Sequence, residues 1–288
     1  MTVATGSAAT RTITLDAHVH TEASHDCSTS PERVVDAALD AGLDAIAVTD
    51  HDAIVGALRA VKAAEDTDLL VVPGVEVSTA DGHLLALGVG AVPEPGRPFG
   101  ETVESVRGAG GVAIVPHPFQ TSRQGVRASV IDDCDGIETL NAVAVTGYQN
   151  RRARQFAVRD GYAAVGGSDA HRPSLIGRAF TSVRLPEDAD WTSMTTADVL
   201  AGIRAGDAAA QGTVTTPIEF AQTYAWHARD TAATAIGSTG AAARSGHTAV
   251  RSRPLASVGA VLGSAMLLSS VPASLGSVPK QVVGRLRP

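Results

Sequence analysis

Short apolar runs alternate along the first two thirds of the chain with segments whose apolar residues recur at helical spacing. The runs are nearly continuous in Val, Ile, Leu and Ala, and each ends in polar or glycine-rich residues, which is typical of buried parallel strands. In the segments between them the apolar residues stand three or four positions apart, which predicts amphipathic helices. The pattern therefore predicts an α/β fold built on a parallel sheet.

The boundaries of the expected elements follow from turn and capping residues. Ser30, Pro31 and Glu32 begin one helix as N-cap, first helical position and early acidic residue, and Gly42 ends it. Asp81-Gly82 predicts a hairpin turn. We expect strands at residues 13–15, 44–48, 68–72, 75–78, 82–88, 112–115, 136–141, 162–165 and 180–185, and helices at residues 31–41, 54–65, 102–107, 151–159 and 196–205.

Two histidines, His18 and His20, follow the first predicted strand with one residue between them. In an extended backbone they project to the same side, about 6–7 Å apart along the strand. That separation suits two ligands of one metal ion or of a small metal cluster. Asp26 follows in the loop and adds an oxygen donor.

Histidine and carboxylate residues also lie at the ends of most other predicted strands. An open sheet binds its ligand at one switch point, whereas all strand ends of a closed barrel face one mouth, so this distribution favours a barrel. A nitrogen and oxygen donor set without thiolates suits Mn, Zn or Fe. The candidate ligands are His18, His20, Asp26, His51, Glu76, His83, His117, Asp169 and His171.

Nine ligands exceed what one ion can use, so we expect two or three divalent ions that share bridging carboxylates, with Glu76 as the bridge. Such a cluster lowers the pKa of a bridging water and neutralises phosphate oxygens, which predicts metal-assisted hydrolysis of a phosphoester by a metal-bridged hydroxide. We expect four of these residues to act directly in catalysis: His18, His20, Glu76 and His171.

The chain resembles the PHP (polymerase and histidinol phosphatase) superfamily over residues 12–185, in six ordered motifs: DAHVHTEASHD, GLDAIAVTDHD, VVPGVEVST, GHLLALG, PHP and GGSDAH. The resemblance implies a distorted, TIM-like (β/α)7 barrel with a trinuclear metal centre that hydrolyses phosphoesters. It also implies a grouping of the ligands. His18, His20, Glu76 and Asp169 would serve one ion, Asp26 and His51 would complete a second that shares Glu76, and His83, His117 and His171 would fill the remaining positions.

This sequence departs from the family pattern in two places. Many members read Ser-Asp-Gly after the second histidine, whereas Ser24-His25-Asp26 contains one extra residue, so Asp26 is the expected ligand and His25 the alternative. Some members also carry a long helical insertion between the Glu and Pro-His motifs. The short stretch between Glu76 and His117 has no room for one, which weakens an assignment as nucleotide phosphatase or exoribonuclease.

Several polar residues near the motifs have roles that the sequence leaves open. Asp16, Asp50 and Asp52 are expected in loops or as partners that orient an imidazole, and Glu138 and Asn141 fit either such a role or a hydrogen bond at the barrel rim. A phosphate substrate needs a cation beyond the metal ions, and the arginine fork suits it. We expect at least one of four arginines to contact phosphate: Arg123, Arg127, Arg172 and Arg178.

The expected substrate is a small phosphomonoester or a nucleotide phosphate. A net charge of −7 and a pI near 5.7 argue against binding of duplex nucleic acid. One alternative is a 5′ or 3′ exonuclease on short DNA or RNA, against which the absence of an aromatic stacking stripe argues. The other alternative is a non-catalytic, metal-binding regulatory module.

The domain organisation follows from a change in composition. We expect a barrel at residues 11–214 and an Ala/Ser/Gly-rich extension at residues 215–288, whose uncharged stretch 255–278 and basic flanks leave a weak membrane contact or self-contact open. Cys27 and Cys134 form no disulfide framework and residues 1–10 contain no apolar signal segment, so a cytoplasmic location is expected.

Overall fold

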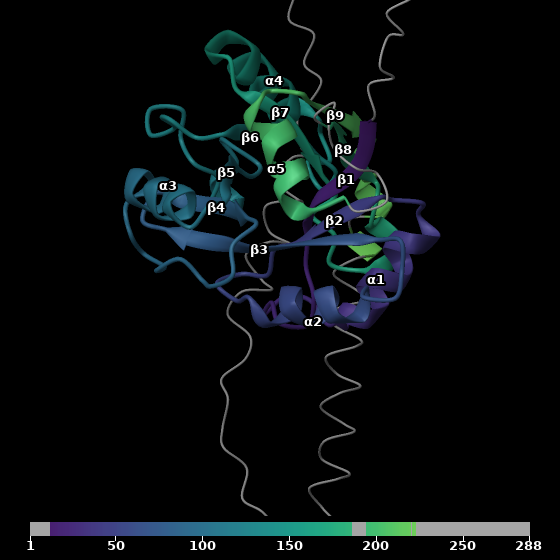
Figure 1. Ribbon diagram of the computed structural model, residues 1–288. Helices are drawn as coiled ribbons and strands as arrows, with labels where there is room; N and C mark the ends of the chain where they lie inside the picture. Colours follow the sequence, from purple (N-terminus) through teal and green to yellow (C-terminus); the bar gives the residue numbers. More distant parts are fainter. Residues whose placement is uncertain (1–11, 186–193, 220, 223–288) are drawn as a thin grey trace, which may run out of the picture. The chain divides into compact units, whose positions relative to one another are not determined.

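The computed structural model describes residues 12–185, 194–219 and 221–222, which all belong to one compact unit (Figure 1). Nine strands of these residues form one sheet in the order β7-β6-β5-β4-β3-β2-β1-β8-β9. The strands are β1 (Thr12–Val19), β2 (Ala45–Val48), β3 (Leu70–Thr79), β4 (Gly82–Leu87), β5 (Val112–Val115), β6 (Gly136–Asn141), β7 (Ala163–Gly167), β8 (Ala179–Arg184) and β9 (Ala208–Gly212). The helices are α1 (Pro31–Asp40), α2 (Val55–Ala63), α3 (Phe99–Gly108), α4 (Tyr148–Asp160) and α5 (Thr196–Arg204).

The sheet curls until β7 meets β1. The Asp169 N–H donates to the His18 carbonyl at 2.8 Å, and the His20 N–H donates to the Ala170 carbonyl at 3.0 Å. These contacts lie at the C-terminal ends of β1 and β7. Along the first half of β1, β8 is the paired strand, and it also lies against β7, where the Thr181 hydroxyl donates to the Gly166 carbonyl. The sheet is thus a nearly closed barrel, which confirms the predicted fold class. It contains nine strands among the described residues, whereas the family resemblance implied seven.

The strand directions are mixed. The triplets β1-β2-β3 and β5-β6-β7 are parallel, but β4 runs antiparallel between β3 and β5, and β8 and β9 are also antiparallel to their neighbours. The expectation of a parallel sheet is therefore wrong for β8, whereas the hairpin at Asp81-Gly82, which makes β4 antiparallel to β3, is confirmed. Because β4 is reversed, its first residues lie at the same end as the last residues of β3 and β5.

Two irregularities in the sheet turn polar side chains inward. Along β1 the inward residues Ile13, Leu15 and Ala17 pack in the barrel interior, while Val19 packs outside with α1 and α2. The register shifts between Asp16 and Val19, and the bulge reverses the alternation of side chains beyond Ala17. A second shift, between Glu138 and Leu140, occurs in β6.

The other end of the barrel is apolar. Val199, Leu200 and Ile203 of α5 pack onto the interior residues of β1, β4, β5 and β8, so α5 closes this end (Figure 1). α1 and α2 cover the outside of the first three strands with small residues such as Ala38, Ala57 and Ala60. We call the opposite end, at which β1 and β7 finish, the mouth.

Sequence patterns misplaced a few elements. β3 is one strand through Pro73-Gly74 instead of two, and both α3 and α4 begin three residues earlier than expected. β9 was not anticipated, because Ala-Ala-Ala-Gln-Gly lacks the branched and aromatic residues of typical strands.

The extension proposed at residues 215–288 lies largely outside the described residues, as does its uncharged stretch 255–278, and the boundary near residue 214 stays a prediction. Among the described residues, no helix is long and apolar enough to cross a membrane.

Candidate metal centre

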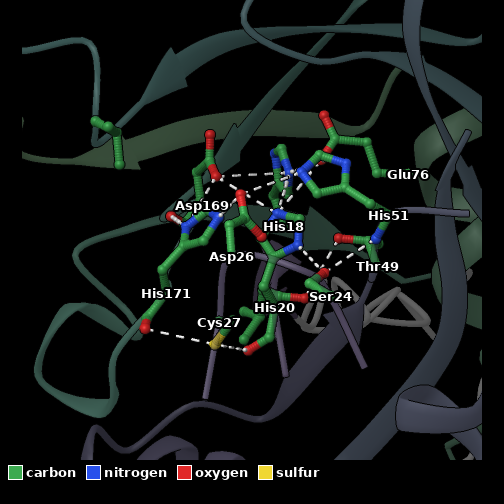
Figure 2. A network of polar contacts seen from close by, with 12 residues as sticks. His18, His20, Ser24, Asp26, Cys27, Thr49, His51, Glu76, Asp169 and His171 are labelled. Carbon is green, nitrogen blue, oxygen red and sulfur yellow. Dashed lines mark hydrogen bonds and ion pairs between the residues drawn. The ribbon is translucent and has the colours of Figure 1, made fainter. Parts of the chain in front are cut away.

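The nine predicted ligands come together at the mouth, from the ends of β1, β2, β3, β5 and β7 and the start of β4 (Figure 2 labels all of them except His83 and His117). Their donor atoms form four overlapping groups, each within 4.8 Å. The groups are His18, Glu76 and His117; His18, His20 and Asp169; His51, Glu76 and His83; and His20, Asp26, His51 and His171.

Glu76 lies at the centre of this arrangement and is almost fully buried. Its Oε1 lies 2.8 Å from His83 Nδ1 and 2.9 Å from His117 Nε2. Its Oε2 lies 3.2–3.3 Å from the facing nitrogens of His18, His20 and His51. Since the two oxygens face different sets of imidazoles, Glu76 has the geometry of a bridging carboxylate.

The distances among His18, His20, Glu76 and Asp169 fit a shared cation. His18 Nε2 and His20 Nε2 face each other at 3.1 Å, and Asp169 Oδ1 lies 3.8 and 3.5 Å from them. Donors about 2.0–2.1 Å from a tetrahedral ion are about 3.3 Å apart. Among the residues that the structure describes, Asp169 Oδ1 and Asp26 Oδ1 moreover have no hydrogen-bond partner although both atoms are buried. Buried acceptors of this kind are costly unless they bind a donor or a cation, so the donor set fits a divalent metal.

Asp26, and not His25, reaches this cluster. Asp26 Oδ2 lies 3.1 Å from His171 Nε2 and 3.5 Å from His51 Nε2. His25 is exposed and only packs its ring against His51, at a centroid distance of 5.1 Å. The geometry therefore favours Asp26 over the alternative raised by the extra loop residue.

Glu138 orients two histidines from within β6. Its Oε1 lies 3.1 Å from His18 Nδ1, and its Oε2 accepts the His117 backbone N–H at 2.6 Å and the Asn141 amide at 2.9 Å. The Asn141 amide also donates to Asp169 Oδ2 at 2.9 Å. Of the two roles that the sequence left open for Glu138 and Asn141, the structure supports contact with the candidate ligands.

Hydrogen bonds through Ser24 and Asp50 fix the orientation of His20, and of these two residues the sequence analysis assigned a role only to Asp50. Its Nδ1 lies 2.9 Å from the Ser24 hydroxyl, which donates to Asp50 Oδ1 at 3.0 Å. Asp50 also accepts the backbone N–H and the hydroxyl of Thr21. Asp50 thus orients His20 through Ser24. The place of Ser24 between His20 and Asp26 was the one feature of the sequence that could have indicated this role. Asp16 instead accepts backbone N–H groups of His18, Ser168 and Gly177, and burial raises its pKa to about 6.

The imidazoles and carboxylates of the centre shift one another's pKa values away from their usual range. Burial acts to lower the pKa of His18, but the carboxylates of Asp169 and Glu76 hold that pKa well above its usual value. Burial acts to raise the pKa of Glu76, yet His18 and His51 hold it well below its usual range. Burial and the nearby Arg123 guanidinium lower the pKa of His117. The site attracts positive charge, as a metal site must.

The four arginines lie in different settings. Arg123, in a 3-10 turn after the Pro-His motif, pairs with Asp169 Oδ2 and lies 3.3 Å from Asn141 Oδ1, so its guanidinium is next to the donor groups. Arg127 is exposed. Arg172 and Arg178 both contact Glu219. Phosphate binding by any of them stays a prediction.

Comparison with known proteins places this centre in context. A sequence model of the PHP domain matches residues 16–171, more than half of the 288-residue chain, and a PHP-associated model matches residues 147–208. An uncharacterized protein of Methanocaldococcus jannaschii is 28% identical over 156 residues, which cover 50% of this chain and 91% of that protein.

Two solved structures share the fold. One is a two-domain protein from Bacteroides vulgatus containing a predicted PHP-like metal-dependent phosphoesterase, with a TM-score of 0.58 and 20% identity, over 71% of this chain and 66% of that one. The other is PsfC from Pseudomonas syringae, with a TM-score of 0.59 and 17% identity, over 76% and 99% of the two chains. At these identities the likeness concerns the fold.

Proposed function

This chain belongs to the PHP domain family, and we propose that it is a metal-dependent hydrolase of phosphoesters. One observation carries the proposal: nine His, Asp and Glu side chains converge at the barrel mouth in overlapping groups around Glu76. The comparisons support the family and the fold. The substrate and the ions are our inference from the site.

We propose that these residues hold two or three divalent ions, with Mn, Zn and Fe as candidates from the donor chemistry. Glu76 would join neighbouring ions, since its two oxygens face different imidazoles. Asp26, His51 and His171 would provide the more open side of the site. When bound, the ions would supply Lewis acidity toward phosphate oxygens and lower the pKa of a coordinated water.

The residues around the ligands prepare the site. Glu138 and the Ser24–Asp50 pair fix the orientation of His18 and His20, so that their facing nitrogens need no reorganisation when a cation binds. Arg123 would pair with a phosphate oxygen, because its guanidinium already lies against the Asp169 carboxylate at the mouth. His171 is fixed by its Nδ1, 2.9 Å from the Asp169 carbonyl. It is among the more exposed ligands, so it would lie on the side where the substrate enters, and an outer water would protonate the leaving group.

The proposed substrate is a small phosphomonoester or a nucleotide phosphate. The connection from β4 to β5 contains only α3, so no large insertion covers the mouth. End-labelled oligonucleotides separate this proposal from the exonuclease alternative, because stepwise release of mononucleotides would favour the exonuclease.

The basic test is hydrolysis of 4-nitrophenyl phosphate by the Mn²⁺-loaded protein. We expect phosphate release that EDTA abolishes and added Mn²⁺ restores. His18→Ala should lower the rate by at least about 100-fold, comparable to the loss of a strong electrostatic contribution at an active site. Glu101→Gln, on the outer helix α3, is the control and should retain the rate. Full activity of His18→Ala would rule out the proposed centre.

A further inference from the structure

Two arginines outside the metal centre lie at the mouth end of the barrel. Arg172 directly follows the candidate ligand His171, so their Cα atoms are about 3.8 Å apart. Arg178 directly precedes β8, which starts at this end because it runs antiparallel to β1. Gly166, near the end of β7, indeed lies against the Phe180 backbone.

Glu219 contacts both arginines, Arg178 through its carboxylate and Arg172 through its backbone carbonyl. Arg178 Nη2 donates to both carboxylate oxygens of Glu219, at 2.9 and 2.7 Å, and Arg172 Nη2 donates to the Glu219 backbone carbonyl at 3.3 Å. The segment leading to Glu219 is held by its backbone. The Thr213 N–H donates to the Arg178 carbonyl, and the Thr215 N–H donates to the Ala142 carbonyl. Glu219 is thus delivered to the pair by the chain that follows β9.

The pair has donors that Glu219 does not use. The Nε atoms of Arg172 and Arg178 are both buried and have no hydrogen-bond partner among the residues that the structure describes. An unpaired buried donor is unfavourable, and a guanidinium presents its donors as a fork that matches a phosphate or carboxylate. The two forks could therefore hold a larger anion than one carboxylate.

We propose that Arg172 and Arg178 form an anion subsite beside the metal centre, which Glu219 fills until a second anionic group of the substrate displaces it. This inference rests on the proposed function and deepens it. The substrate would be a small phosphorylated compound that carries a further phosphate or carboxylate. Exchange is feasible because the Arg178 and Glu219 side chains are 29% and 31% exposed, and an ion pair so exposed is weak.

The variant Glu219→Gln separates this role from that of a helix cap. Glu219 also accepts the Thr216 N–H at 2.8 Å and donates its own N–H to the Thr216 hydroxyl at 3.3 Å, as in a capping box. Glutamine serves equally well at that position of the box, so the substitution keeps the cap and removes the competing charge. Glu101 on α3 forms another exposed ion pair, with Arg97 just before the helix, so Glu101→Gln removes the same charge and is the matched control.

The test is calorimetric titration of the metal-free, full-length protein with inorganic phosphate. We expect Glu219→Gln to bind phosphate about two- to fivefold more tightly than the unmodified protein, the range of an exposed ion pair. Adding Arg178→Gln should remove this gain, and Glu101→Gln should show none. Unchanged or weaker binding by Glu219→Gln, or a gain that persists without Arg178, would overturn the subsite.

A kinetic experiment follows if the loaded enzyme is active. Phosphoglycolate and ethyl phosphate differ by one carboxylate, so Glu219→Gln should lower KM for the first and leave KM for the second unchanged. Equal effects on both compounds would count against the subsite. Because the titration needs no turnover, it decides on the arginine pair even if 4-nitrophenyl phosphate is not hydrolysed.

Discussion

The imidazole of His18 shows how much of the centre depends on residues that bind no ion. Its Nε2 faces His20 and Glu76, while its Nδ1 lies against the fully buried Glu138. Glu138 in turn accepts hydrogen bonds from the His117 backbone and from Asn141. Partners of this kind fix the tautomer and the direction of a metal-binding imidazole. The orientation of the ligands therefore depends on residues of β6 as much as on the histidines themselves.

The loop after His20 allows a direct test of ligand identity. Asp26→Asn keeps the size of the side chain but removes a charge that faces His51 and His171. We expect Mn²⁺ affinity, measured by calorimetry, to fall by at least about tenfold, since loss of an outer partner alone costs about 10–100-fold. His25→Ala, one residue away and exposed, should change the affinity by less than about twofold. A larger effect of His25→Ala would return the ligand role to the extra residue.

The predicted ligands could be recognised from sequence because each belongs to a motif at a strand end, and all nine do converge. The role of Ser24 was missed, since its place between His20 and Asp26 is a weak signal for a serine in a polar loop. The pairing of Arg172 and Arg178 with Glu219 joins residues more than 40 positions apart and required the structure. Local pattern identifies a donor, whereas the partner that orients it depends on tertiary packing.

At the scale of elements, strand direction and strand irregularities position the site. His83 is in the cluster because β4 is antiparallel to β3, which brings the hairpin turn and the first residues of β4 to the mouth. With simple alternation the odd-numbered residues of β1 would face the interior along its whole length. The bulge reverses this order, so that His18 and His20 point inward instead. Hydrophobic periodicity predicted most of the strands. It contains no information about a register shift, or about an edge strand such as β9 that lacks large apolar side chains.

The packing of α2 against the His20 loop makes a second prediction. A Cβ at Gly56 would overlap Asp50 Oδ2 and Thr21 Oγ1, which are buried and hydrogen-bonded to each other at 2.7 Å. Gly56→Ala should therefore lower the free energy of unfolding in urea by about 1–3 kcal/mol. It should also weaken Mn²⁺ binding, since Asp50 supports Ser24 and His20.

The control for Gly56→Ala is the same substitution at Gly100 in helix α3. A Cβ there meets nothing within 4 Å, so Gly100→Ala should be neutral or stabilise the protein by about 0.4–1 kcal/mol. Equal stability of the two variants would show that the α2 contact is not tight.

The molecule as a whole divides its barrel into a structural end and a functional end. α5 and the apolar interior close one end, while the other contains three carboxylates and six imidazoles, most of which are buried. So many buried titratable groups make the stability of the metal-free protein depend on pH. Metal ions and protons must compete for the same atoms.

The direction of this competition can be predicted from His51. Burial acts to lower its pKa, but the carboxylates of Glu76 and Asp26 raise it to about 9. In the metal-free protein, the stability contributed by protonated His51 is complete below about pH 6.5, its unfolded pKa, and is lost as the pH rises through 9. Metal binding requires the neutral imidazole, so apparent affinity should rise over the same interval.

Thermal unfolding with and without a fixed excess of Mn²⁺ measures both trends. Between about pH 6.5 and 8.5, the midpoint of the metal-free protein should fall while the increase caused by Mn²⁺ grows, so the gap between the two curves widens. The acidic ligands do not oppose this trend, because the pKa values of Glu76 and Asp169 stay well below their usual range and both groups are ionised throughout. His18→Ala should reduce the increase at every pH. A gap that is constant with pH would show that the bound ions do not displace protons from these imidazoles.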